Sequence, residues 1–229
     1  MGSVNAAIGE KIAEGAESIV FRGSIMGVDV VVKIRVSRSY RHPEYDRVFR
    51  SYRTRMEVRV MADLLAKGLR VPTPILVDME NYVIVMTYIR GRKLSHVISD
   101  LGGETLEEIY RDIGRQVGVM HASGIYHGDL TVSNIMITDR KEVYLIDFGL
   151  SGYSRDVEEY AIDLHLFDRS TRSLTPARAD ELFGAFLKGY QASFPRYLEV
   201  VERMKDIRRR GRYIEERLRR KLRREAYTS

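Results

Sequence analysis

The sequence predicts an α+β fold in two lobes, with the strands in the N-terminal part of the chain and the helices in the C-terminal part. Segments rich in β-branched and aromatic residues, separated by turns, occupy most of residues 1–87. Residues 88–202 instead carry the apolar periodicity of helices. Basic residues collect in 203–229, which we predict to be a separate tail. The 229 residues allow one domain or two closely packed lobes.

The N-terminal lobe is predicted to contain five strands and one long helix. The sequence Glu-Gly-Ala-Glu at 14–17 and Gly27 mark turns, and Gly68 is a typical helix stop. The predicted strands cover residues 8–13, 18–25, 28–34, 75–78 and 82–87, and the predicted helix covers 46–67.

The C-terminal lobe is predicted to be mainly helical. The predicted helices cover residues 94–101, 105–123, 156–170, 176–192 and 196–224, and Gly91 marks a break before the first of them. Short apolar segments at 135–137 and 143–146 are typical of strands. Gly114 and Gly118 lie one turn apart within a predicted helix, so we expect them to serve packing and not phosphate binding.

The composition indicates a globular chain with a sizeable core. Apolar residues make up 44% of the sequence, and no apolar segment is long enough to span a bilayer. The absence of cysteine excludes disulfides and thiolate zinc sites. No signal-peptide pattern is visible at the N-terminus, so we expect a cytoplasmic protein that does not bind membranes.

The net charge of +6 is distributed unevenly along the chain. Residues 203–224 contain twelve basic and three acidic side chains, a local charge of +9, which leaves −3 for the remainder. Arginine, which is suited to bidentate phosphate contacts, supplies 30 of the 38 basic residues. The tail therefore favours an anionic partner, although a solvated arginine-rich helix is the alternative.

Two polar motifs carry the strongest functional signal. Residues 127–134 read His-Gly-Asp-Leu-Thr-Val-Ser-Asn, and Asp147-Phe148-Gly149 follows the two short apolar segments. Asp129 and Asn134 are five residues apart, and Asn134 and Asp147 are thirteen apart. These spacings match the catalytic and magnesium-binding loops of the protein-kinase fold. We therefore expect Asn134 and Asp147 to bind Mg²⁺ and Asp129 to orient a hydroxyl or water; the alternative is that they only cap turns.

Lys33 and Glu57 are predicted to complete the phosphate site. Lys33 ends an apolar strand, in the position of the kinase lysine that contacts ATP phosphates. Glu57 lies between Met56 and Val60 on the following helix, so it could pair with Lys33 and hold its ammonium toward phosphate. The alternative is that Glu57 is one surface charge among several arginines.

The nucleotide is expected to lie between the lobes. The turn at 14–17 occupies the place of a phosphate-covering loop, but Gly15 is its only glycine where three are usual. Backbone groups of the segment that joins the lobes would meet the adenine edge, and apolar side chains would cover its faces. The residues expected to contact ATP, besides Gly15, Lys33 and Glu57, are Val20, Val31, Met86, Thr87, Ile89 and Met136.

Together these motifs resemble the protein-kinase superfamily and, more closely, the small atypical kinases of the KEOPS complex, the PRPK family. The resemblance covers nearly the whole chain. Its signatures are the turn at 14–17, the arginine-rich helix at 53–65, the loops at 127–134 and 147–150, Glu-Glu-Tyr-Ala-Ile-Asp-Leu at 158–164 and Arg-Arg-Arg-Gly-Arg at 208–212.

The resemblance implies a protein-kinase-like bilobal fold with a reduced helical C-lobe. It implies an atypical serine/threonine protein kinase or ATPase that uses ATP and Mg²⁺ in threonylcarbamoyl-adenosine modification of tRNA. The expected partners are the threonylcarbamoyl-transferase subunit and other KEOPS subunits. The basic tail is the expected contact with tRNA.

Several departures from ordinary protein kinases change these expectations. Gly128 stands where an arginine that receives an activation-loop phosphate is usual, so switching by that phosphate is not expected. Thr131 replaces a lysine that helps to hold the transferred phosphate. No Ala-Pro-Glu follows Asp147, and 82 residues remain, so the platform for a peptide substrate is predicted to be truncated. Asp163 is expected to brace the backbone of the catalytic loop.

Two other functions remain open from the sequence. One is a small-molecule phosphotransferase of the aminoglycoside- or sugar-kinase type, which shares the His-Gly-Asp-Leu loop but usually has a larger C-terminal domain. The other is a nucleotide-binding scaffold with little chemistry, against which the intact Lys33, Asp129, Asn134 and Asp147 argue.

Overall fold

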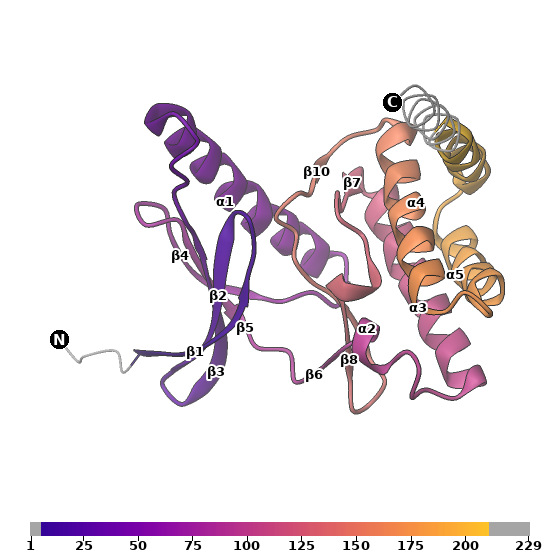
Figure 1. The fold of residues 1–229 in the computed structure, drawn as a ribbon, viewed down its shortest axis with the longest axis horizontal. Coiled ribbons are helices and arrows are strands. Elements are labelled where there is room, and N and C mark those ends of the chain that lie inside the picture. The colour runs from indigo at the N-terminus through magenta and orange to yellow at the C-terminus, as the bar shows by residue number, and fades with distance from the viewer. Residues whose placement is uncertain (1–5, 211–229) are drawn as a thin grey trace, which may run out of the picture.

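The computed structural model describes residues 6–210 of the chain. Its N-terminal part is a five-stranded antiparallel sheet with one long helix (Figure 1). The strands are β1 (Ala6–Glu14), β2 (Ser18–Ile25), β3 (Val28–Arg35), β4 (Pro74–Asp78) and β5 (Val83–Thr87), in the order β1-β2-β3-β5-β4. All five strands predicted for this part of the chain are confirmed, with bounds that differ by two residues or fewer.

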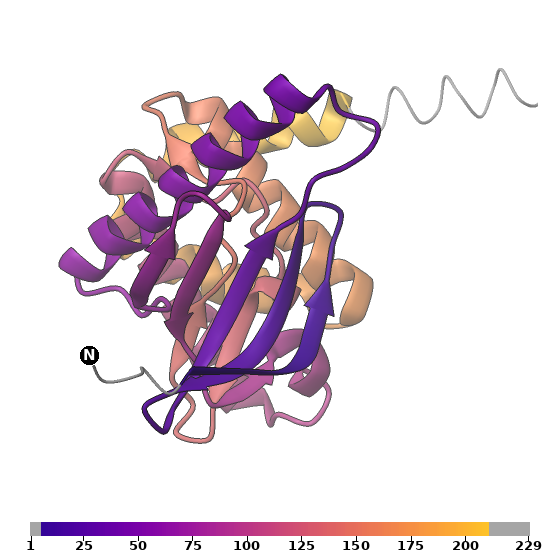
Figure 2. The same cartoon turned by 90° about the vertical axis from the view of Figure 1, so that its left-hand side faces the viewer.

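Helix α1 (Pro43–Ala66) lies across one face of this sheet (Figure 2). It begins three residues earlier than predicted because proline is tolerated in the first helical turn, where its missing N–H costs nothing. It ends as predicted before Gly68, which has a φ of 75°. Helices commonly end at a residue in this left-handed conformation, and glycine adopts it without steric cost. The helix buries Val60, Met61 and Leu64 in the main core.

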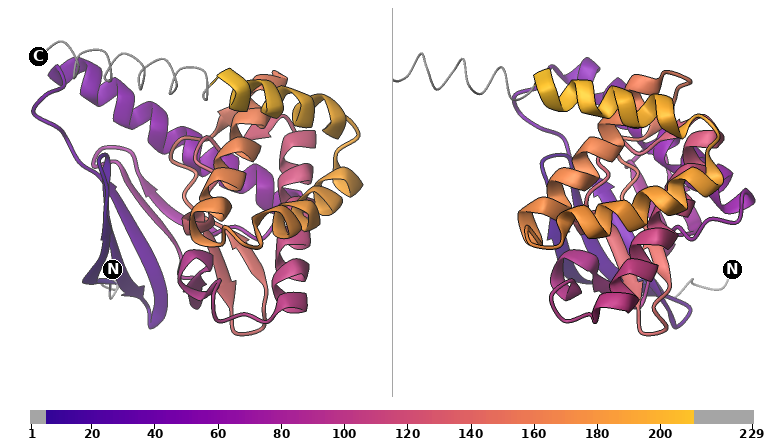
Figure 3. Two further views of the ribbon diagram at one scale, coloured as in Figure 1. Left: turned by 45° about the vertical axis from the view of Figure 1, so that its right-hand side comes forward. Right: turned by 90° about the vertical axis from the view of Figure 1, so that its right-hand side faces the viewer.

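The C-terminal part is mainly helical, with three short antiparallel pairings (Figure 3). Its helices are α2 (Leu94–Val97), α3 (Gly103–Ala122), α4 (Val157–Leu174) and α5 (Ala179–Ser193), preceded and connected by β6 (Gly91–Lys93), β7 (Ile125–Tyr126), the 3₁₀ turn η1 (Val132–Asn134), β8 (Ile135–Thr138), β9 (Val143–Leu145) and β10 (Gly152–Tyr153). Residues 197–210 are also helical. The predicted helix 196–224 therefore holds as far as 210, and its remainder lies outside the described residues.

Four short segments differ from the sequence prediction. Helix α2 ends at Val97 and not at 101. Strand β6 occupies the segment where Gly91 was predicted to mark a break. A Cβ atom at Gly91 would lie 2.4 Å from the Ile137 carbonyl oxygen, so glycine allows β6 to approach β8 closely. Strands β7 and β10, of two residues each, have too little periodicity to be seen in a sequence.

Helices α3 and α5 pack closely because glycines line their contact. A Cβ atom at Gly114 would lie 1.9 Å from the Phe186 carbonyl oxygen, and one at Gly189 would lie 1.9 Å from that of Arg111. A Cβ atom at Gly118 would lie 2.8 Å from the Ser193 Cβ. The predicted packing role of Gly114 and Gly118 is thus confirmed. Within residues 6–210, no helix is both long enough and apolar enough to cross a membrane.

Residues 197–210 pack against the C-terminal lobe. Met204 is buried, Arg203 pairs with Glu158 of α4, and Arg208 pairs with the buried carboxylate of Asp168. Arg208, Arg209 and Arg210 of the predicted basic tail therefore belong to a helix that packs on the body of the protein. The other basic residues of the tail, from 212 onward, lie outside the described residues.

Candidate active site between the lobes

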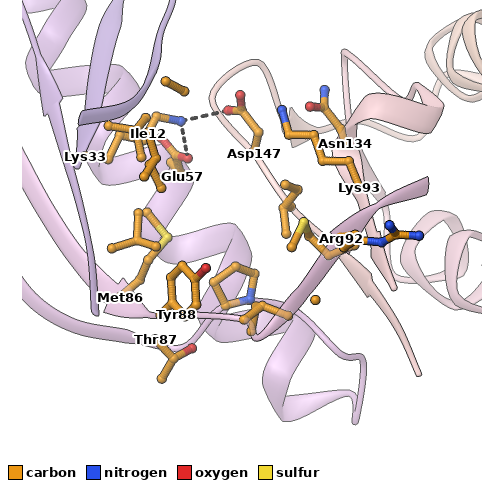
Figure 4. Close-up of a pocket in the computed structure, with 18 of the residues that line it drawn as sticks. Ile12, Lys33, Glu57, Met86, Thr87, Tyr88, Arg92, Lys93, Asn134 and Asp147 are labelled. Atoms are coloured by element: carbon orange, nitrogen blue, oxygen red, sulfur yellow. Dashed lines mark hydrogen bonds and ion pairs between the residues drawn. The ribbon is translucent and has the colours of Figure 1, made fainter. Parts of the chain in front are cut away.

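A cavity of about 380 Å³ opens between the strand-rich lobe and the helical lobe (Figure 4). It is within the size range of small-molecule sites. Ten of the residues that the sequence assigned to ATP and metal binding line it: Val20, Val31, Lys33, Glu57, Met86, Thr87, Ile89, Asn134, Met136 and Asp147. These residues come from β2, β3, α1, β5, the linker between the lobes, η1, β8 and the loop after β9.

Lys33 joins two acidic residues at the back of this cavity. Its Nζ donates to Glu57 Oε1 at 2.7 Å and to Asp147 Oδ1 at 2.7 Å. Glu57 is 1% exposed, so the alternative interpretation as a surface charge is wrong. The predicted Lys33–Glu57 pair is confirmed, and its role in holding phosphate stays a prediction. The contacts connect β3, α1 and the Asp147 loop, which are far apart in sequence.

The charges of this cluster stabilise one another. Burial acts to lower the pKa of Lys33, but the carboxylates of Glu57 and Asp147 outweigh it and raise the pKa above its ordinary value. Burial likewise acts to raise the pKa of Asp147, but the Lys33 ammonium overcomes it and lowers the pKa to about 2. Both groups are therefore ionised at neutral pH, as a phosphate-binding lysine and a metal-binding carboxylate need to be.

Arg35 is a further member of the cluster that the sequence analysis missed. Its Nη2 donates to Glu57 Oε2, so each carboxylate oxygen of Glu57 receives one cation. Arg35 is 3% exposed, and its Nη1 also forms an ion pair with Glu17 Oε2 of the neighbouring turn at 3.8 Å. The two-residue period of a strand could have identified Arg35. Residues two apart on β3 share a face of the sheet, and Lys33 was already expected to face the site.

The turn at 14–17 is held by arginine side chains and not by glycine flexibility. Arg38 donates to the carbonyl oxygen of Gly15 at 2.7 Å and to that of Ala16 at 2.6 Å. Arg41 donates to Glu17 Oε1 at 3.3 Å. Gly15, which the sequence assigned to the nucleotide, does not line the cavity; Ile12 and Ala13 of β1 do. The carbonyl oxygen of Gly15 is instead engaged by Arg38.

Asp129 and Asn134 are joined across the catalytic loop. The Asn134 amide nitrogen donates to the Asp129 carbonyl oxygen and to Asp129 Oδ2, both at 2.9 Å. Asn134 lines the cavity, whereas Asp129 is not among the lining residues and is held by these two bonds. The arrangement leaves the Asn134 side-chain oxygen on the cavity side of the loop for a cation.

Asp163 of α4 braces this loop from below, as predicted. It accepts hydrogen bonds from the backbone N–H of His127 at 2.6 Å and of Gly128 at 2.8 Å, and it contacts His121 Nε2 at 3.2 Å. Gly128 has a φ of 80°, and a Cβ atom there would lie 2.3 Å from the Leu150 carbonyl oxygen. Glycine in place of the usual arginine is therefore required by the backbone of this loop.

The donor atoms at this site are suitable for Mg²⁺. Asn134 and Asp147 present oxygen ligands, and the Asp147 side chain is 52% exposed to the cavity. No group of three or more His, Cys, Asp or Glu side chains within residues 6–210 forms a complete metal cage. Mg²⁺ prefers such incomplete sites, where one or two protein oxygens act together with phosphates and water. The residues present thus fit a metal that arrives with a nucleotide.

An apolar slot beside the linker is suitable for a planar base. Val20, Val31, Met86 and Met136 line it. The amide of Thr87 donates to the Thr73 carbonyl oxygen at 3.0 Å, so this group is not free to meet a base edge. The backbone of Ile89 makes no hydrogen bond within the described residues. The Thr87 N–H is therefore excluded from the expected contact with the base edge, and the contact by Ile89 stays a prediction.

The helical lobe adds basic residues to the cavity wall that the sequence analysis did not find. They are Arg92 and Lys93 of β6 and His96 of α2. The reason for the omission is that β6 itself was not predicted, so nothing placed these side chains beside the site. Ile12, Ala13, Pro72, Tyr88, Gly91 and Ile146 are the other lining residues that were missed.

Comparison with known proteins agrees with this geometry. The RIO domain model matches residues 29–160, a range that runs from β3 into α4 and contains Lys33, Asp129, Asn134 and Asp147. The EKC/KEOPS complex subunit bud32 of Dictyostelium discoideum is 35% identical over 211 residues, which cover 90% of this chain and 83% of that protein. The KEOPS complex subunit Bud32 of Pyrococcus abyssi is 36% identical over 212 residues, 89% of this chain and 96% of that protein.

A second group of relatives is longer. The probable bifunctional tRNA threonylcarbamoyladenosine biosynthesis protein of Methanocaldococcus jannaschii is 38% identical over 206 residues. The match covers 89% of this chain but 37% of that protein. The chain therefore corresponds to somewhat more than a third of the length of such relatives.

Proposed function

The chain belongs to the RIO-domain family, together with the Bud32 subunits of KEOPS complexes, and from this we propose that it is a Mg²⁺- and ATP-dependent atypical kinase or ATPase in tRNA threonylcarbamoyladenosine biosynthesis. One structural observation carries the proposal. Lys33, Asn134 and Asp147 meet in a single cavity, with Lys33 paired to a buried glutamate, in a chain whose family has a kinase-like domain.

The residues divide the work of phosphoryl transfer among themselves. Lys33 contacts the phosphates, with its ammonium oriented by Glu57. Asn134 and Asp147 would hold Mg²⁺, which would supply positive charge against the phosphates. Asp129 accepts a proton from the attacking hydroxyl or water as a bond forms to the terminal phosphorus and the bond to the ADP oxygen breaks. The Asn134 amide orients Asp129 for this step.

The acceptor of the phosphoryl group is either water or a serine or threonine hydroxyl of a protein. Thr131 and Gly128 remove two cations that protein kinases use, and this favours hydrolysis or an acceptor presented by a partner. A small-molecule phosphotransferase is not favoured, because the relatives that cover most of this chain and of their own length are KEOPS subunits.

The proposed partners are the threonylcarbamoyl-transferase subunit and other KEOPS subunits. The bifunctional relatives support the first of these, because their name gives one chain two functions and this chain corresponds to only part of it. A cytoplasmic location is part of the same proposal.

Mixing the purified chain with a purified threonylcarbamoyl-transferase subunit tests the partner. We expect a stable complex at micromolar concentration and a changed rate of phosphate release. The matched control is the complex with Asp147→Ala, which should still form but release no phosphate. If no complex forms while the chain alone binds and hydrolyses ATP, the enzymatic part of the proposal stands and the partner is wrong.

We also propose that the basic tail contacts tRNA. Binding of an RNA by clustered arginines releases counterions, so the affinity should fall steeply with salt. The test is deletion of residues 211–229, which retains Arg208 as the partner of buried Asp168. Filter binding at two salt concentrations should show weaker RNA binding and unchanged ATP affinity. A salt-insensitive affinity, or full RNA binding by the shortened chain, would exclude the tail as the RNA contact.

A further inference from the structure

One lysine in the cavity has no part in the site described so far. Lys93 forms no ion pair with any residue among 6–210, whereas its neighbour Arg92 pairs with Asp100 at 3.0 Å. Figure 4 shows the Lys93 ammonium pointing into the cavity on the side of Asn134 and Asp147, while the Arg92 guanidinium turns away. Lysine is uncommon in this chain, with 8 residues against 30 arginines, yet two of the eight line this cavity.

The backbone beneath Lys93 is held firmly beside the metal-binding residues. Lys93 pairs with Met136 across β6 and β8, and Met136 is two residues beyond Asn134. The close approach at Gly91, where a Cβ atom would meet the Ile137 carbonyl oxygen at 2.4 Å, holds the two strands together. Lys93 is also the residue that precedes the first turn of α2. Its side chain therefore reaches the cavity from a rigid element and not from a loop.

The catalytic loop has a charge deficit that this lysine can fill. Thr131 stands where a lysine would help to hold the transferred phosphate, and no other cation of residues 127–134 replaces it. Lys33 is the cation on the opposite wall, and its ammonium is shared between Glu57 and Asp147. A polyphosphate placed beside Asn134 and Asp147 would meet the Lys33 ammonium from the strand-rich lobe, and a cation of the helical lobe would add a charge-assisted hydrogen bond to its oxygens.

We propose that Lys93 binds the terminal phosphates of the nucleotide and supplies from β6 the cation that the catalytic loop lacks at Thr131. This inference rests on the proposed function. It assigns to the helical lobe its own phosphate ligand, so that the nucleotide's phosphates are held between Lys33 on one wall and Lys93 on the other.

The test is Lys93→Met, which keeps the length of the apolar stem and removes the charge. Calorimetry in Mg²⁺ should show ATP binding about 10- to 100-fold weaker, the loss typical of a charged hydrogen bond. Adenosine binding should be unchanged, because the nucleoside carries no phosphate. The matched control is Lys188→Met on the exposed surface of α5, which should bind both molecules as the parent chain does. Melting temperatures establish that both variants are folded.

A second variant tests whether the charge acts where we place it. Adding Thr131→Lys to Lys93→Met returns the cation to the catalytic loop and should recover ATP affinity and phosphate release at least in part. Full ATP affinity in Lys93→Met, or equal losses for ATP and adenosine, would overturn the inference. If the parent chain itself bound no ATP, the proposed function would fail first, and the role of Lys93 with it.

Discussion

Replacing Glu57 with glutamine is expected to destabilise the protein and to misplace Lys33, the proposed phosphate ligand. Glu57 is 1% exposed, and its two carboxylate oxygens receive hydrogen bonds from Lys33 and Arg35, which are 5% and 3% exposed. The glutamine has nearly the same shape, so the change removes the charge and leaves the packing of α1 against the sheet unaltered. Two buried cations then lose their shared counterion.

The size of the effect follows from this geometry. Removing one partner of a buried ion pair typically costs about 3–5 kcal/mol. Lys33 keeps Asp147 at 2.7 Å, and Arg35 keeps the more distant Glu17 at 3.8 Å, so we expect the lower end, about 3 kcal/mol. In a domain of this size, that corresponds to a fall in melting temperature of about 6–12 °C. The rate of ATP turnover should fall at least about tenfold, because the Lys33 ammonium is then held by the metal-binding carboxylate alone.

Urea denaturation and phosphate release measure the two effects. The matched control is Glu108→Gln on the exposed side of α3, which removes the same charge and should change the free energy of unfolding by less than about 0.5 kcal/mol. If Glu57→Gln unfolds with the free energy of the parent chain, the cluster does not depend on the Glu57 charge and the reasoning is refuted.

Three further predictions follow from the site and the core. Asp147→Ala should abolish ATP turnover because the metal loses a ligand, whereas Asp129→Ala should lower turnover and leave nucleotide affinity nearly unchanged. Phosphate release measures the turnover and calorimetry measures the affinity. Parental turnover in the two variants would contradict the assignment. In a carboxyl NMR titration, Asp147 should ionise with a pKa of about 2, and in Lys33→Met its pKa should rise toward the ordinary value of 3.8, because burial is then opposed only by His127 and the Gly149 N–H. The folded pKa is the lower one, so the Lys33–Asp147 pair contributes stability above about pH 4 that is lost as the pH falls toward 2; an unchanged titration in Lys33→Met would rule this out. Gly114→Ala should lower the free energy of unfolding by about 1–3 kcal/mol or more, because its Cβ atom would meet the Phe186 carbonyl oxygen. Gly184→Ala is the control and should not destabilise the protein, because nothing lies within 4 Å of its Cβ position. Equal denaturation midpoints for the two variants would show that α3 and α5 can move apart at little cost.

The parts of this protein that could be predicted from its sequence are those in which a local pattern carries the information. The strands of the N-terminal lobe and the end of α1 were predicted because their periodicity and glycine signals lie within the segments themselves. The residue types and spacings of 127–134 and Asp147 indicated the kind of chemistry for the same reason. Glu57 was predicted to face Lys33 because its helix showed which side was apolar.

The remaining features depend on contacts between segments that are distant in the chain, and these were decided by the tertiary structure. Arg35 shares Glu57 with Lys33 only because α1 is packed against β3. Ile12 and Ala13 of β1 line the cavity in place of Gly15, and Arg38, 23 residues later in the chain, engages the Gly15 carbonyl oxygen. Lys93 lines the same cavity as Asn134 and Asp147 because β6 pairs with β8 across more than forty intervening residues. A strand of three residues such as β6 carries too little periodicity to be recognised in a sequence. The residue that a side chain contacts across the fold is decided by packing and by backbone pairing, and not by its neighbours in the sequence.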